Sequence, residues 1–201
     1  MKKFKLVYDV LIFIVFMLGI IKLVQNEYFL GITWMIITPL LMLLPRNLYK
    51  LKKIKENYQY NIVLFFEVSI LILVVTSVGH TLYFKNINID FDSFSHFINL
   101  LIYTVLFGII YFITRYKGYS NANKNEVAIV SLIILLIFGV ILWEKFQFYG
   151  DKIFNTHMFY DNFQNSKYDS KLDQIFGAIG VLVGSFVLYK GINSWMKSWR
   201  K

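Results

Sequence analysis

Three segments of the chain carry acidic residues or histidine, and in two of them these residues have the spacing of successive helical turns. Asp92 and His96 are four residues apart, so a helix would place both side chains on one face. Glu144 closes a long apolar run, and Asp169 and Asp173 are again four residues apart. Carboxylates and imidazoles bind divalent metal ions, and they also serve as general acids and bases. These segments therefore predict either a metal site or proton-transfer chemistry.

Two roles are candidates for these residues, general base and metal ligand. Glu144 or His96 is the candidate general base, and Asp173 is a candidate metal ligand or orienting group. The sequence leaves the cofactor open, with a divalent metal ion of unspecified identity as the candidate, and no residue is predicted to bind an organic cofactor. The candidate metal ligands are His80, Asp92, His96, Glu144, Asp169 and Asp173.

Structural roles are the alternative for the same residues. Asp92 and Asp169 would favour a helix amino terminus as caps, and His96 would serve as an interhelical hydrogen-bonding group. Glu144 is harder to explain in this way, because we expect it at the carboxyl end of its span, where the helix dipole disfavours negative charge. Glu67 is expected near the other side of the membrane, where it either reaches the interface or joins a proton relay.

The composition places these residues in a membrane. Of the 201 residues, 57% are hydrophobic and 16% are charged, and the mean hydropathy is +0.56. A soluble domain has roughly 25% charged residues, so the composition argues against a soluble monomer. The absence of cysteine excludes a disulfide scaffold and a thiolate metal site.

Six apolar runs have about the length of 20 residues that a helix needs to cross the hydrocarbon layer. We therefore expect an all-α polytopic membrane protein, a bundle of six transmembrane helices forming a single domain over residues 1–201, with a motif-bearing core at about 61–189. Glycines at 177, 180 and 184 predict a strip where another helix approaches closely. The spans are about 6–24, 28–45, 61–84, 93–114, 127–148 and 172–189.

The distribution of charge predicts the orientation. Most of the 21 Lys and Arg residues fall at 1–5, 46–60, 115–126 and 190–201, which alternate with the other loops. Because positive loops stay in the cytoplasm, both termini are expected to be cytoplasmic in a cell-membrane protein. The net charge of +9 then suits anionic headgroups, and no nucleic-acid partner is expected. All the candidate ligands fall at the outer ends of their spans.

These segments also carry a family resemblance. Asp92-x-x-x-His96-Phe97, then Trp143-Glu144, then Asp169-x-x-x-Asp173-x-x-x-Gly177-Ala178 resemble the YjdF-like family of bacterial inner-membrane proteins. The order is also similar to that of VanZ-like proteins, and it extends over about residues 75–185. The resemblance implies a multi-pass membrane protein, and for VanZ-like members an association with resistance to glycopeptide-type antibiotics. Asn155-Thr156-His157-Met158 and Lys171 depart from the expected pattern.

Three functions follow as hypotheses. The first is a cell-membrane protein whose outward-facing acidic/His pocket binds a metal ion or a polar headgroup, with membrane lipids, a polar lipid or an envelope precursor as partner. The second is a small proton-coupled transporter with a relay of Glu67, His80, His96 and Glu144. The third is a non-catalytic envelope protection or assembly factor.

The sequence leaves open whether the protein is an enzyme, and it leaves the oligomeric state open. A loop of about two dozen residues before the sixth span is expected to fold over the pocket.

Overall fold

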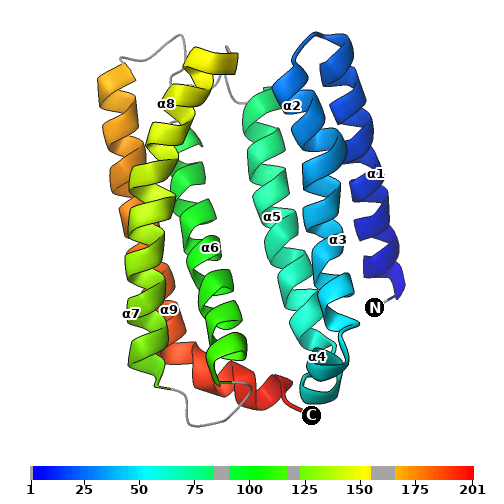
Figure 1. Ribbon diagram of the computed structural model, residues 1–201, viewed down its shortest axis with the longest axis vertical. Coiled ribbons are helices and arrows are strands. Elements are labelled where there is room, and N and C mark those ends of the chain that lie inside the picture. Colours follow the sequence, from blue (N-terminus) through cyan, green and yellow to red (C-terminus); the bar gives the residue numbers. More distant parts are fainter. Residues whose placement is uncertain (1, 84–90, 117–122, 155–165) are drawn as a thin grey trace. The chain divides into compact units, whose positions relative to one another are not determined.

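The structure, a computed structural model, describes residues 2–83, 91–116, 123–154 and 166–201, and these are nearly all helical (Figure 1). The described ranges contain no β-strand, so the prediction of an all-α polytopic membrane protein is confirmed. Within these ranges, six helices are long and apolar enough to span a membrane, which confirms the number of spans. They are Phe4–Val24, Tyr28–Tyr49, Asn61–Gly79, Asp92–Tyr116, Lys124–Gly150 and Ser170–Trp199.

The chain divides into two compact units, residues 1–74 with 201 and residues 75–200. The single domain expected from the sequence stays a prediction, and each unit is described by itself. The first unit contains α1 (Lys2–Val24), α2 (Tyr28–Ile32), η1 (Thr33–Ile37), α3 (Thr38–Tyr49) and α4 (Lys52–Asn57), and α5 (Asn61–Tyr83) begins there.

The second span of the first unit changes helix type before a proline. The segment η1 is a π-helix, and Pro39 lies in the first turn of α3. A proline donates no amide hydrogen bond, and its ring crowds the carbonyl four residues earlier, which here belongs to Met35 within η1. A wider π-turn accommodates that crowding without ending the span. Pro45, where the sequence predicted the span to end, lies inside α3.

The second unit packs α6 (Phe91–Tyr116) and α9 (Ser166–Trp199) against a third span made of α7 (Lys124–Leu135), η3 (Leu136–Leu142) and α8 (Trp143–Phe154). Leu100, Leu135, Val140 and Val181 form the buried cluster where these helices meet. The predicted loop of two dozen residues is wrong, because α8 runs to Phe154 and α9 starts at Ser166. Both helices continue past their apolar runs, and the intervening 155–165, with the Asn155–Met158 departure, lie outside the described residues.

Glycines let α9 approach α6 at backbone distance. A Cβ added at Gly180 would lie 2.3 Å from the carbonyl oxygen of Phe97, and one added at Gly184 would lie 2.9 Å from that of Leu101. A Cβ at Gly177 would meet the Leu100 side chain at 2.7 Å. The predicted close-packing strip is therefore confirmed, and it fixes the relative height and rotation of the two helices.

We expect Gly180→Ala to destabilise the protein by about 1–3 kcal/mol, because the new methyl group would force the α6 backbone away. The measurement is thermal unfolding of the purified chain in detergent. Gly191→Ala is the matched control on the same helix, since the atoms nearest its Cβ belong to the side chain of Trp195, at 2.4 Å, rather than to the backbone of another helix. Equal unfolding temperatures for the two variants would show that the α6–α9 contact is not tight.

Candidate functional site

Three of the predicted ligands meet at one end of the second unit. Asp92 and His96 lie in the first two turns of α6, and Asp173 lies near the start of α9. One ligand atom from each lies within 4.8 Å of the others. His96 Nε2 is 3.8 Å from Asp92 Oδ1 and 3.8 Å from Asp173 Oδ2. We call Asp92, His96 and Asp173 the triad.

Helix phase and close packing bring the triad together. Asp92 and His96 share a face of α6, as their four-residue spacing predicted. Asp173 stands one turn before Gly177, on the face of α9 that packs against α6. Asp173 is 4% exposed, so its charge lies inside the protein rather than in lipid.

Ser93 orients the buried carboxylate of the triad. Its hydroxyl donates a hydrogen bond to Asp173 Oδ1 at 2.9 Å, and both residues are buried. The other oxygen, Oδ2, is the one nearest His96. A hydrogen bond to the far oxygen fixes the rotation of the carboxylate, which is how residues around metal sites commonly orient the ligands.

Glu144 lies beside the start of α9 and outside the triad. Ser170 donates a hydrogen bond to Glu144 Oε2 at 2.7 Å, and both residues are buried. The expectation that Glu144 ends its helix is wrong, since α8 continues for ten residues to Phe154. The π-helical η3 comes just before Trp143 and Glu144. An inserted residue turns the following helix by about 100°, so η3 sets the direction of the Glu144 side chain.

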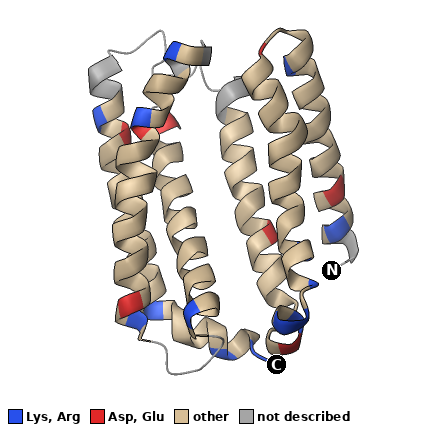
Figure 2. Ribbon diagram, in the orientation of Figure 1, with Lys and Arg blue, Asp and Glu red and all other residues tan. Residues whose placement is uncertain are grey.

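The structure brings three of the six predicted ligands together, places a fourth elsewhere, and does not describe the side chains of the other two. Asp92, His96 and Asp173 converge, and Glu144 pairs with Ser170. The side chains of His80 and Asp169 lie outside the described residues, although the helices that carry them, α5 and α9, are described. Figure 2 shows acidic positions of α6, α8 and α9 at the end of the unit where α6 and α9 begin.

Sequence reasoning missed the two serines. The spacing is three residues from Ser170 to Asp173 and four from Asp173 to Gly177, so all three lie on one face of α9. That spacing was the available signal for Ser170. Ser93 had no such signal, because its role depends on a partner 80 residues away.

The first unit contains an ion cluster that the sequence did not predict. Arg46 of α3 donates from Nε to Glu67 of α5 and from Nη1 to Asp9 of α1. Glu67 is 1% exposed, so the prediction that it reaches the interface is wrong. Arg46 also lies over the Tyr8 ring, 5.0 Å from its centroid, and Tyr8 donates to the Met42 carbonyl oxygen at 2.9 Å. One guanidinium thus joins three helices.

The comparison with protein families agrees with this architecture. A family described as "Predicted membrane protein (DUF2238)" matches residues 5–193. The chain belongs to this family. No curated protein and no solved structure matches the chain.

The residues that match the family extend over both units. The match includes Asp9, Arg46 and Glu67 of the first unit as well as the triad of the second. Its description establishes a membrane protein and assigns no activity.

We expect Glu67→Gln to destabilise the protein by about 3–5 kcal/mol, since it leaves the Arg46 charge without its buried partner. Asp9→Asn is the matched control and should cost no more than about 1 kcal/mol, because the Asp9 side chain is 45% exposed. Thermal unfolding in detergent measures both.

The double variant Arg46→Gln with Glu67→Gln separates charge from packing. It should recover most of the stability that Glu67→Gln loses, because no uncompensated buried charge is left. Similar losses for Glu67→Gln, Asp9→Asn and the double variant would contradict a buried ion pair.

Proposed function

We propose that the triad binds a divalent metal ion on the outer side of a bacterial cell-membrane protein whose two termini face the cytoplasm. One observation carries the proposal, the 3.8 Å that separates His96 Nε2 from a carboxylate oxygen on each side. That distance is longer than a hydrogen bond. Two ligands of a tetrahedral zinc ion lie about 3.4 Å apart, so a small adjustment would admit a metal ion between them.

The donor set suits zinc best. One imidazole nitrogen and two carboxylate oxygens match a borderline metal ion, whereas calcium takes six to eight oxygen ligands. Three protein ligands leave a coordination position open, as in catalytic zinc sites. When bound, the ion would supply Lewis acidity to a polar group at that position. Ser93 would hold Asp173 in its ligating rotation.

Glu144 is proposed as the proton acceptor next to the metal ligands rather than as a ligand. It lies outside the triad, it is buried, and the Ser170 hydroxyl holds it at 2.7 Å. A held carboxylate of this kind is suited to take a proton from a bound headgroup or from water. His96 then acts as a metal ligand, which replaces its alternative role as a base.

The proposed ligand of this centre is a polar headgroup, in an envelope function of the kind that the YjdF-like and VanZ-like resemblance implies. Support comes from the position of the triad near the start of two spans, with Asp92 and His96 in the first two turns of α6 and Asp173 near the start of α9. A relay that includes Glu67 gains no support, because Arg46 already binds that carboxylate inside the first unit.

We expect the purified protein to contain close to one equivalent of zinc per chain by elemental analysis. His96→Ala and Asp173→Asn should lose the zinc, because each removes a ligand, and Ser93→Ala should weaken binding about 10–100-fold. Glu144→Gln is the matched control and should keep the zinc. Bound zinc should fall as the pH is lowered, because protons compete for the ligand atoms.

Two results would overturn the metal proposal. One is a wild-type protein that takes up no divalent ion after dialysis against zinc, manganese or magnesium. The other is equal metal content in wild type, His96→Ala and Asp173→Asn, provided that gel filtration shows each variant to be folded.

The orientation has a separate test that uses the cysteine-free sequence. A single cysteine at Gln25→Cys, in the turn after α1, should react with a membrane-impermeant maleimide in intact cells. A cysteine at Asn125→Cys, which is exposed at the start of α7, should react only after the cells are opened. The reverse pattern would place the termini and the triad on the opposite sides from those proposed.

A further inference from the structure

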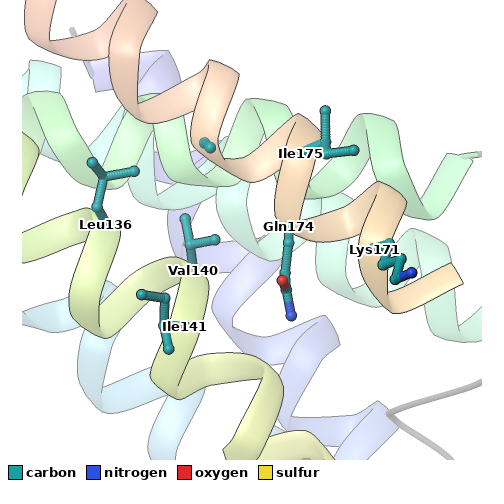
Figure 3. A pocket seen from close by; sticks show the side chains of 7 residues that line it. Leu136, Val140, Ile141, Lys171, Gln174 and Ile175 are labelled. Carbon is teal, nitrogen blue, oxygen red and sulfur yellow. The ribbon is translucent and has the colours of Figure 1, made fainter. Parts of the chain in front are cut away.

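An open apolar groove runs along α9 beside η3. Its volume is about 430 Å³, and Figure 3 shows the Gln174 side chain extending from α9 toward the helix that carries Val140 and Ile141. Several lining side chains are exposed, among them Ile141 at 51% and Ile175 at 54%. The groove is lined by Leu136, Val140, Ile141, Lys171, Gln174, Ile175 and Ala178.

The groove is polar at one end and apolar at the other. Lys171 and Gln174 belong to the first turns of the span that starts at Ser170. Ala178 lies seven residues beyond Lys171, which is about 10 Å deeper along the helix. A membrane-spanning helix thus presents the cation at the level of the headgroups and the apolar walls at the level of the acyl chains.

The polar end lies at about the same height along α9 as the site described above. Lys171 follows Ser170, whose hydroxyl holds Glu144 at 2.7 Å. Val140, which lines the groove, comes four residues before Glu144 along the same span. A molecule whose chain lies in the groove would therefore have its head at the height of the Ser170–Glu144 pair along α9.

From this arrangement we infer that the groove binds one phospholipid with an anionic headgroup, the acyl chain lying against Val140, Ile175 and Ala178 and the phosphate on Lys171. Charge complementarity supports this occupant, since the seven lining residues include one lysine and no carboxylate. The apolar walls favour a ligand with an acyl chain over a free phosphate, and the lysine favours a headgroup with net negative charge. The inference deepens the proposed function, because it names the class of headgroup that the metal centre would face.

The experiment measures retained lipid by native mass spectrometry of the purified full chain. Protein in detergent is mixed with phosphatidylglycerol or phosphatidylcholine of equal chain length, and inorganic phosphate is added as a competitor. We expect phosphatidylglycerol to be retained in preference to phosphatidylcholine, and phosphate not to displace it. Lys171→Gln should weaken phosphatidylglycerol binding about fivefold, in line with one lysine near an anionic headgroup. Lys197→Gln, an exposed lysine at the other end of α9, is the matched control and should change nothing.

A second pair of variants tests the apolar walls. Ile141→Trp should fill the groove and reduce retention of both lipids, whereas Ile179→Trp, at an exposed α9 position outside the lining, should not. Equal retention of the two lipids by wild type, or equal effects of Lys171→Gln and Lys197→Gln, would overturn the inference. Zinc content is measured on the same samples. Absence of zinc would contradict the metal proposal alone, and absence of a preference for phosphatidylglycerol would contradict the lipid proposal alone.

Discussion

A charged side chain inside a lipid bilayer has to find its partner within the protein, and this constraint organises both units. In the first unit, Arg46 is the partner of the buried Glu67 and also binds Asp9. One guanidinium therefore links three helices. In the second unit, hydroxyl groups hold the buried carboxylates: Ser93 binds Asp173, and Ser170 binds Glu144. Without such partners, polar groups at this depth would cost several kcal/mol each.

The two clusters differ in whether their geometry suits the binding of a ligand. In the first, the carboxylates share an arginine that also lies over the Tyr8 ring, an arrangement suited to fixing helices in place. In the second, two carboxylates flank one imidazole at distances longer than a hydrogen bond. A cation inserted there would offset the like charges, which is why we assign metal binding to the triad and structural stabilisation to Arg46.

Backbone packing makes the second arrangement possible. The triad needs α6 and α9 close enough for Asp173 to reach His96, and the glycine at 180 allows this, since a Cβ there would lie 2.3 Å from a carbonyl oxygen of α6. The π-helical η3 then turns the third span so that Glu144 faces Ser170. The groove along which we place a phospholipid chain lies between η3 and α9. The triad thus depends on the close approach of α6 and α9, and the groove depends on the packing of α9 beside η3.

The sequence by itself determined the spans, because hydropathy over about 20 residues decides where a helix crosses the bilayer whatever its neighbours are. It also singled out Asp92, His96 and Asp173, since four-residue spacing fixes a shared face before any packing occurs. Only the tertiary structure decided that Glu144 stands with Ser170 rather than with these three, and that Glu67 is buried on Arg46. Those outcomes depend on the rotation and height of one helix against another. Side chains many residues apart set these quantities, and no local pattern records them.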